Sequence, residues 1–212
     1  MSIPIIILGS GGHAKVLIDV LRIRDIKVVG ITSIELQDIN KKLNGINVIG
    51  NDEAIFRYSP ESVHLVNGIG YTGKTEKRRE LFDFFKKKGY SFASVIHPSA
   101  VISPDVQIDE GVQVMAGSVI QPGSVIKKNT IINTKVSVDH DCIIGAHVHL
   151  APGVTISGGV CVEDAVHIGT GALVIQGIHI GKKCLIGAGS LVLNNIKEGS
   201  TVFGLPAREM NS

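Results

Sequence analysis

The sequence has no tryptophan, and aromatic residues account for only 4% of its 212 residues. Hydrophobic residues nevertheless reach 44% and charged residues 19%, values that are ordinary for a soluble protein. The chain also has 25 glycines. This combination indicates repeated turns and layers of aliphatic side chains, and the length permits one large domain or two small ones.

Cysteine is scarce too, with only Cys142, Cys161 and Cys184. Their odd number and the absence of any CxxC spacing argue against a disulfide framework and against a zinc cluster. We interpret the three thiols as small side chains of the core.

The sequence also lacks a strong charge bias and a long apolar run. The formal net charge is +2, and the basic residues are dispersed apart from KTEKRRELFDFFKKKG, which we interpret as the solvated face of a helix. We therefore expect no nucleic-acid partner. The apolar run from Ile3 to Leu8 has no basic leader and is too short for a signal peptide or a membrane span. We expect a cytoplasmic protein with no membrane partner.

Residues 1–95 have the pattern of a parallel α/β domain. The segments IPIIILG, KVVGI and VHLVNGIG are typical of strands, and SGGHAKVLIDVLRIRD and TEKRRELFDFFKKKG are typical of helices. This part has about the size of one mononucleotide-binding unit, so we predict a Rossmann-like fold for it.

Residues 96–212 follow a period of six. From Ile102 to Val192, sixteen consecutive repeats place an aliphatic residue in the same phase. Two residues before each of them lies a second column of small or β-branched side chains. Glycine follows the aliphatic residue in four repeats, at Gly145, Gly169, Gly181 and Gly187. We expect turns with positive φ at these four glycines.

A strict period of six predicts a parallel β-helix. Each short strand would stack on the equivalent strand of the next coil, about 4.8 Å away, with large aliphatic side chains along the axis. An α-helix does not explain the pattern, because 3.6 residues per turn do not divide six.

Four motifs together resemble one group of enzymes. They are GSGGHAKV near the N-terminus, IHPSAVISPDV and INTKVSVDHDCIIGAHVHLAPG in the repeats, and VFGLPAREM near the C-terminus. Over nearly its whole length the chain resembles the left-handed β-helix nucleotide-sugar N-acetyltransferases and the related sialic acid O-acetyltransferases. This resemblance implies a left-handed coil, acetyl-CoA as acetyl donor, a nucleotide-sugar substrate and a homotrimer.

His140 is the candidate general base. In the implied reaction a sugar amine or hydroxyl attacks the thioester of acetyl-CoA, and a base must remove its proton. Histidine titrates near neutral pH, and the neighbouring Asp139 and Asp141 can stabilise the imidazolium that forms. By the resemblance, Asp141 is the acidic residue that assists the catalytic histidine. The alternative is that DHD is a polar turn without chemistry.

Other polar residues of the repeats have implied or expected roles. The resemblance implies that His149 contacts the thioester region of acetyl-CoA and that Asn133 binds substrate. His149 follows His140 by half an 18-residue coil, so we expect the two to project from different faces and to meet between neighbouring subunits. We expect His167 to stack on His149 and His147 to be exposed. Zinc needs three or four convergent ligands, which this spacing does not favour, so we expect no metal.

The resemblance also implies contacts with acetyl-CoA in three turns. These are Gly158 in SGGV, Thr170 in IGTGA and Ala188 in IGAGS. Each of them is equally compatible with a purely structural role as a turn residue of the repeat.

The N-terminal GSGGH follows a strand and begins a helix, where its glycines would let a phosphate approach the backbone amides. The resemblance implies that Gly11, Gly12 and His13 contact the nucleotide sugar, and that Gly70 in NGIGY does as well.

The end of the second strand departs from the pattern of the resembled family. That family usually has acidic residues there, which contact the nucleotide, whereas this chain has Thr32 and Ser33. We treat both as candidate substrate-binding residues. The choice between uridine, guanosine and thymidine stays open.

The sequence therefore predicts transfer of acetyl from acetyl-CoA to the amino group of a nucleotide-activated amino sugar, such as a 4-amino-4,6-dideoxy sugar, for surface glycans. O-acetylation of a sialic acid or a related sugar needs the same base and is one alternative. A non-catalytic β-helix scaffold is the other.

Overall fold

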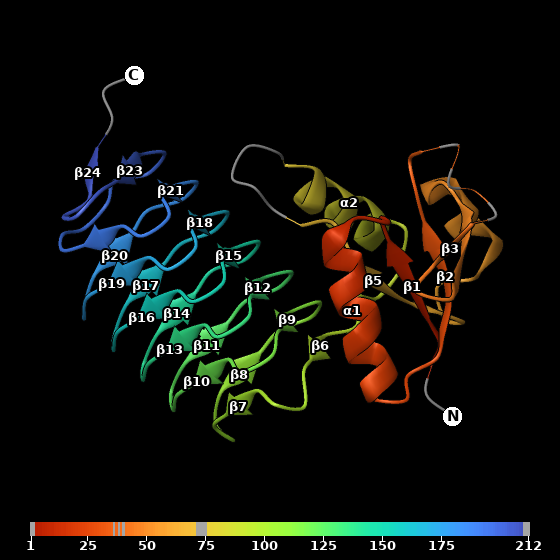
Figure 1. The fold of residues 1–212 in the computed structure, drawn as a ribbon, viewed down its shortest axis with the longest axis horizontal. Helices are drawn as coiled ribbons and strands as arrows, with labels where there is room; N and C mark the ends of the chain where they lie inside the picture. Colours follow the sequence, from red (N-terminus) through yellow and green to blue (C-terminus); the bar gives the residue numbers. More distant parts are fainter. Residues whose placement is uncertain (1–2, 36, 38, 40, 71–75, 210–212) are drawn as a thin grey trace. The chain divides into compact units, whose positions relative to one another are not determined.

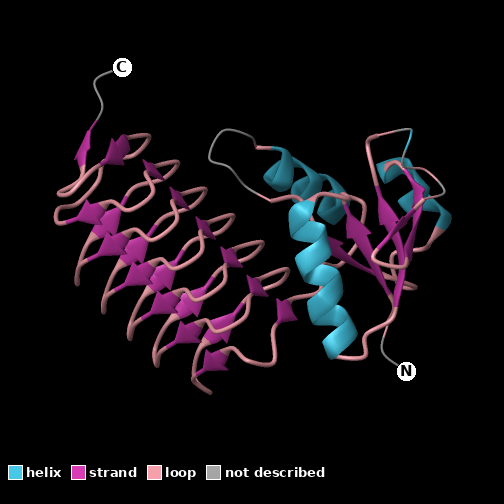
Figure 2. Cartoon of the chain, viewed as in Figure 1, coloured by secondary structure: helices cyan, strands magenta, loops and turns pink. Residues whose placement is uncertain are grey.

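The computed structural model describes residues 3–35, 37, 39, 41–70 and 76–209. The chain divides into two compact units, Met1–Pro98 and Ser99–Ser212. Figures 1 and 2 show that the first contains helices and strands and the second a ladder of short strands. This order confirms the predicted fold class of an α/β domain followed by a β-helix. Within the described ranges, no helix is both long and apolar enough to cross a membrane.

A five-stranded sheet in the order β3-β4-β2-β1-β5 forms the centre of the first unit. Its strands are β1 (Ile5–Leu8), β2 (Val28–Thr32), β3 (Lys42–Leu43), β4 (Ile46–Gly50) and β5 (His64–Asn67). All are parallel except β3, which pairs antiparallel with β4. The chain adds β2 on one side of β1 and later adds β5 on the other. The carboxyl ends of β1 and β5 therefore form a topological switch point, where α/β sheets bind ligands.

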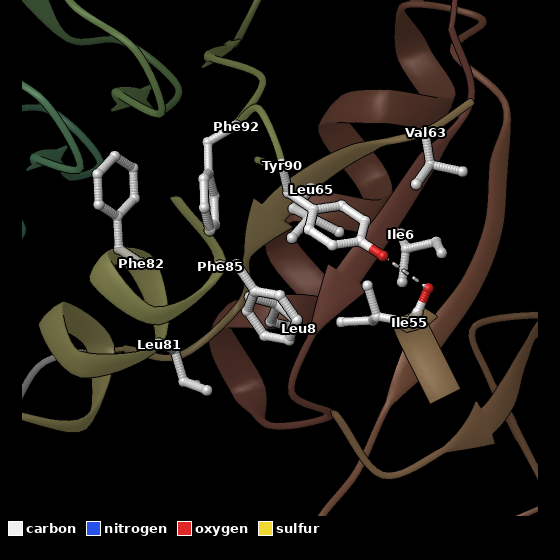
Figure 3. Packing of buried hydrophobic residues seen from close by; sticks show 10 residues of the cluster. All are labelled: Ile6, Leu8, Ile55, Val63, Leu65, Leu81, Phe82, Phe85, Tyr90 and Phe92. Atoms are coloured by element: carbon white, nitrogen blue, oxygen red, sulfur yellow. Dashed lines mark hydrogen bonds between the residues drawn. The ribbon is translucent and has the colours of Figure 1, made fainter. Parts of the chain in front are cut away.

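Helical segments pack on this sheet and close its core. They are α1 (Gly12–Ile23), η2 (Asp52–Arg57) and α2 (Lys77–Lys87), and the short strand β6 (Val95–Ile96) comes after them. Figure 3 shows a buried cluster in which Ile55 of η2 and Phe85 of α2 pack with residues of the strands. The Tyr90 hydroxyl donates to the Ile55 carbonyl at 3.3 Å, which ties this cluster together.

The second unit is built from three sheets of short strands, which have two residues each except for β23 and are parallel except for β24. One contains β7 (Val101–Ile102), β10 (Val119–Ile120), β13 (Ser137–Val138), β16 (Thr155–Ile156), β19 (Leu173–Val174) and β22 (Leu191–Val192). Another contains β8 (Gln107–Ile108), β11 (Val125–Ile126), β14 (Ile143–Ile144), β17 (Cys161–Val162) and β20 (His179–Ile180). A third contains β9 (Gln113–Val114), β12 (Ile131–Ile132), β15 (His149–Leu150), β18 (His167–Ile168), β21 (Leu185–Ile186), β23 (Thr201–Phe203) and the antiparallel β24 (Arg208–Glu209).

The register of these strands follows the period of six. Paired residues lie 18 positions apart, as Ile120 does from Val138 and Val138 from Ile156. The aliphatic column points inward, and these three side chains are at most 1% exposed. Three sheets of six-residue repeats make one coil, which is the β-helix that the sequence predicts.

The expected turns at four glycines are wrong by two residues. Gly145, Gly169, Gly181 and Gly187 do not have positive φ, whereas the residues two positions further on do, namely His147, Gly171, Lys183 and Gly189. The four glycines serve another purpose. A Cβ at Gly145 would lie 2.6 Å from the carbonyl carbon of Glu163 in the next coil. Glycine is present because the coils approach closely at that point.

Candidate active site

His140 lies in the turn that follows β13, next to a residue with unusual backbone geometry. Asp141 has φ of 57°, in the left-handed region. The equivalent positions of other coils are occupied by glycine, at Gly123, Gly159 and Gly177, all with positive φ. Aspartate tolerates this region better than most residues, but it costs on the order of 1 kcal/mol more than glycine there. An aspartate where the repeat favours glycine points to a role for its carboxylate.

The two side chains form a hydrogen-bonded pair. His140 Nδ1 lies 2.8 Å from Asp141 Oδ2, and the backbone N–H of His140 donates to Asp139 Oδ1 at 2.8 Å. The hydrogen bond that His140 donates to Asp141, followed by the charge of Asp139, raises the pKa of His140 above its ordinary value. With the proton held on Nδ1 by the carboxylate, the neutral ring has its lone pair on Nε2. Both side chains are exposed, so substrate can reach them.

Glycines in the coils before and after make room for this pair. A Cβ at Gly158 would lie 2.6 Å from His140 Nε2, and a Cβ at Gly123 would lie 2.5 Å from Asp141 Oδ1. Any larger residue at either position would displace the imidazole or the carboxylate. The structure thus places Gly158 against the ring of His140, the candidate base, and the predicted contact of Gly158 with acetyl-CoA stays a prediction.

His149, in β15, is held by a hydrogen bond to the side chain of Asn133. Asn133 Nδ2 lies 3.1 Å from His149 Nε2, and Asn133 Oδ1 accepts from the Thr134 N–H at 2.8 Å, which fixes the orientation of the amide. Because an amide NH₂ only donates, Nε2 accepts and the neutral His149 ring carries its proton on Nδ1. His149 is buried, whereas His140 is exposed.

The sequence also predicted the positions of His167 and His147. His167 pairs with His149 in register and meets its ring edge-on, with centroids 5.0 Å apart, as the repeat predicts. Burial lowers the pKa of His167. His147 was expected to be exposed but is half-buried, with Nδ1 2.9 Å from Asn129 Nδ2. In the described part of the chain, no group of three or more His, Cys, Asp or Glu side chains could hold a metal ion.

Two of the predicted acetyl-CoA contacts stack on each other. Thr170 and Ala188 are both exposed and occupy equivalent turns after β18 and β21. The Thr170 carbonyl accepts from the Gly189 N–H at 2.8 Å, which joins the two turns. Gly158 follows β16 in a different sheet, so the structure does not group it with them.

In the first unit, the predicted phosphate-binding residues lie at the switch point of the sheet. Gly11 is the N-cap of α1, and Gly12 and His13 begin the helix immediately beyond β1. A Cβ at Gly70, beyond β5, would lie 3.6 Å from the His13 Cβ. The loops after β1 and β5 are therefore adjacent, and the helix N-terminus offers amides to an anion there.

Thr32 and Ser33 are buried at the end of β2 and hydrogen-bonded to the same glycine loop. Ser10 Oγ donates to Ser33 Oγ at 2.9 Å, and Thr32 Oγ1 accepts from the Gly9 N–H at 3.2 Å. Thr32 Oγ1 also donates to Asp52 Oδ1 at 2.6 Å. Asp52 thus brings a carboxylate to the strand end where the sequence shows only hydroxyls. Asp52 was not among the residues predicted from the sequence, because its contact with Thr32 depends on the pairing of β2 with β4.

Two known protein families match parts of the chain. Residues 4–84 match the family described as the PglD N-terminal domain, and residues 123–158 match the bacterial transferase hexapeptide, six repeats. No curated protein sequence matches the chain.

Solved structures give close matches over the full length. PerB from Caulobacter crescentus, in complex with CoA and GDP-perosamine, is 37% identical with a TM-score of 0.90, covering 98% of this chain and 97% of its own. The acetyltransferase domain of PglB from Neisseria gonorrhoeae, in complex with acetyl coenzyme A, is 32% identical with a TM-score of 0.90, covering 99% and 100%. WeeI from Acinetobacter baumannii is 26% identical with a TM-score of 0.80, covering 99% and 100%. The chain therefore belongs to the family of hexapeptide-repeat sugar acyltransferases.

Proposed function

We propose that the protein transfers the acetyl group of acetyl-CoA to the amino group of a nucleotide-activated amino sugar, with a 4-amino-4,6-dideoxy sugar as the expected acceptor. The exposed His140–Asp141 pair carries this proposal, because it is an oriented base with an adjacent carboxylate. The relatives solved with CoA and GDP-perosamine, or with acetyl coenzyme A, support both substrates.

The geometry accounts for the proton that the reaction must move. His140 Nε2 takes a proton from the sugar amine as its nitrogen attacks the thioester carbonyl. Asp141 stabilises the imidazolium through the Nδ1–H bond of 2.8 Å. Collapse of the tetrahedral intermediate breaks the C–S bond, and the imidazolium returns its proton to the departing thiolate. The products are an amide and free CoA.

The remaining site residues divide between the two substrates. Gly11, Gly12, His13 and Gly70 would bind the nucleotide sugar with Thr32, Ser33 and Asn133, while His149, Gly158, Thr170 and Ala188 would contact acetyl-CoA. We further propose that the enzyme is a cytoplasmic homotrimer whose products enter surface glycans. The hexapeptide family supports the trimer.

The decisive experiment measures release of the CoA thiol with a panel of UDP-, GDP- and dTDP-linked 4-amino-4,6-dideoxy sugars. Wild-type protein should release thiol with at least one of them. His140→Ala should lower kcat by about 10²- to 10⁴-fold, the usual contribution of a general base.

His147→Asn is the matched control. It replaces another histidine of the β-helix, and asparagine suits the left-handed backbone of that position, so the rate should be unchanged. Absence of acetyl transfer across the whole panel would contradict the proposal and favour a scaffold. Loss of the acetyl group from the product in alkaline hydroxylamine would identify an ester, and thus the O-acetylation alternative.

A further inference from the structure

The turn that contains His140 is closed by a side chain of the preceding coil. Ser124 Oγ donates to the Asp139 carbonyl at 2.9 Å and accepts from the Cys142 N–H at 3.2 Å. These two backbone groups are the ends of the turn, and His140 and Asp141 lie between them. Ser124 comes directly before β11 and Cys142 directly before β14, and these two strands pair in register (Figure 1). One hydroxyl therefore binds both ends of the turn that carries the proposed base.

Other turns of the β-helix close through a direct backbone hydrogen bond. The Val106 N–H donates to the Ser103 carbonyl at 3.1 Å, and the Val154 N–H donates to the Ala151 carbonyl at 3.3 Å. In the turn that carries the proposed base, the Ser124 hydroxyl stands between the two equivalent groups and serves both. Its removal would leave a carbonyl and an amide without this partner, which is costly where water does not replace it.

A hydroxyl is not required by the repeat at this position. The equivalent residues one coil earlier and two coils later are Val106 and Val160, whose side chains are apolar. Ser124 is completely buried. Because a buried hydroxyl is unfavourable unless it is hydrogen-bonded, the two bonds to the turn account for the serine.

The coil that contains Ser124 has a hydroxyl at each of its three corners. Ser118 Oγ donates to the Asn133 carbonyl at 2.8 Å, and Thr130 Oγ1 donates to the Gly145 carbonyl at 2.7 Å. The coil that receives all three bonds is the one with the candidate residues of the DHD turn. The hydroxyls are therefore concentrated directly before the coil that carries the proposed chemistry.

Cys142 continues these contacts into the following coil. Its Sγ donates to the Ser157 carbonyl at 3.2 Å and lies 3.6 Å from the His140 carbonyl. Burial raises the pKa of the Cys142 thiol, so the sulfur keeps its proton and acts as a donor. Ser157 precedes Gly158, which lies against the His140 ring. The turn is thus bound to the coil before it through Ser124 and to the coil after it through Cys142.

We infer that Ser124 is a positioning residue, whose hydroxyl fixes the turn in which His140 meets Asp141 and thereby directs the imidazole toward the substrate. The inference rests on the proposed function, because it concerns the orientation of the proposed base. Ser124 is buried and acts only through the turn. Misplacement of a reacting group by about 1 Å can cost roughly 100-fold in rate, so one bond of this kind is enough to affect catalysis.

Replacement of Ser124 by threonine and by valine tests the inference, because the two new side chains differ only in a hydroxyl against a methyl group. Both residues occur at this position of the repeat, as Thr130 and Val136. In the thiol-release assay, Ser124→Thr should keep a kcat close to that of the wild type. Ser124→Val should lower kcat by about 10- to 100-fold and leave the KM of both substrates nearly unchanged.

The pKa of His140 is a second measurement, and it needs no substrate. The hydrogen bond to Asp141 is the main cause of the raised pKa, so a displaced turn should lower it and move the acidic limb of the kcat profile to lower pH. NMR titration of the imidazole protons measures this pKa, with the His140 signal identified by its loss in His140→Ala. The pKa should fall in Ser124→Val and not in Ser124→Thr.

Thr130→Val is the matched control. Thr130 Oγ1 bridges the next turn in the same way, since it donates to the Gly145 carbonyl and accepts from the Val148 N–H at 3.1 Å. Residues 145–148 include none of the proposed site residues. Thr130→Val should lower the melting temperature about as much as Ser124→Val, while kcat and the pKa of His140 stay unchanged.

Ser124→Ala keeps the test available if Ser124→Val does not fold. It removes the hydroxyl without adding volume, and it should reproduce the loss of kcat and the fall in the pKa of His140. A wild-type kcat in Ser124→Ala would overturn the inference.

Two other results would also overturn it. An equal loss of kcat in Ser124→Thr would show that the size of the side chain matters and the hydroxyl does not. An equal loss in Thr130→Val would show a general effect of packing in this coil. Failure of the proposed function has a different signature, since the wild-type protein would release no thiol with any sugar of the panel, while the pKa of His140 would still distinguish the Ser124 variants.

Discussion

At the scale of single residues, the site combines features that are local in sequence with one that is not. DHD was recognisable as a candidate site because His140 and Asp141 are neighbours in the chain, and the structure joins them by a hydrogen bond of 2.8 Å. The contact between Thr32 and Asp52 spans 20 residues and depends on the pairing of β2 with β4. A single sequence with no pairing information does not reveal such a contact.

The raised pKa of His140 determines how activity should depend on pH. The base works only when neutral, so the rate rises as pH increases through that raised pKa. Asp141→Asn removes the charge and the charge-assisted bond, so the pKa falls and the acidic limb of the kcat profile moves to lower pH. The plateau should fall by about 10- to 100-fold, because the imidazolium loses its partner. Measuring kcat from pH 5 to 9 checks both effects.

Asp141→Gly separates catalysis from backbone conformation. Glycine relaxes the left-handed backbone, so we expect a free energy of unfolding raised by about 1 kcal/mol together with a loss of activity at least as large as that of Asp141→Asn. If thermal unfolding instead showed a less stable variant, Asp141 would have a structural rather than a catalytic reason to occupy this turn.

At the scale of elements, the repeat determined almost everything about the β-helix except the shape of its turns. The period of six gave the strand phase, the inward column and the 18-residue register, all visible in pairs such as His149 with His167. The error concerned where glycine is needed. Gly145 and its equivalents allow close approach of coils, while the positive φ falls two residues later. A sequence pattern alone does not distinguish these two reasons for glycine.

Replacement by alanine should lower activity at Gly158 and stability at Gly145. A methyl group at Gly158 meets the end of the exposed His140 side chain, which can move aside. Gly158→Ala should therefore leave the melting temperature nearly unchanged while lowering kcat by about 100-fold through misplacement of the base. Gly145→Ala meets backbone of the next coil and should cost roughly 1–3 kcal/mol of stability. Thermal unfolding and thiol-release kinetics on both variants decide the point, and an active Gly158→Ala enzyme would contradict it.

At the scale of the whole molecule, the two units contribute different parts of the proposed reaction. The first has the switch point and the glycine loop that we propose to bind the nucleotide, and the second has the proposed base. Both were recognisable in the sequence as candidates, because the first unit alternates strands and helices and the second has a period of six. The oligomeric state depends on contacts between surfaces of different subunits, and no sequence motif of this chain marks those surfaces. An activity measurement on mixed subunits therefore tests the proposed trimer.

Mixed trimers test whether two subunits share one active site. His140 lies in the turn after β13, whereas His149 lies in β15 of a different sheet, so we expect an active site to use His140 of one subunit and His149 of a neighbour. Inactive His140→Ala and His149→Ala proteins, co-expressed with different tags and purified through both, should regain a measurable fraction of wild-type activity. Verified mixed trimers without activity would show that each subunit supplies both residues itself.

The stacked register also has a consequence for how proteins of this kind change in length. Because the strands from β7 to β22 pair with strands 18 residues away, as in β10, β13 and β16, an insertion of one whole coil among them leaves every other residue on its own sheet. An insertion of six or twelve residues would keep the inward aliphatic phase but move every later strand to another sheet, and a length that is not a multiple of six would also turn later aliphatic side chains away from the axis. We therefore expect natural homologues to differ in the length of the second unit by complete coils, gained or lost after the turn that contains His140.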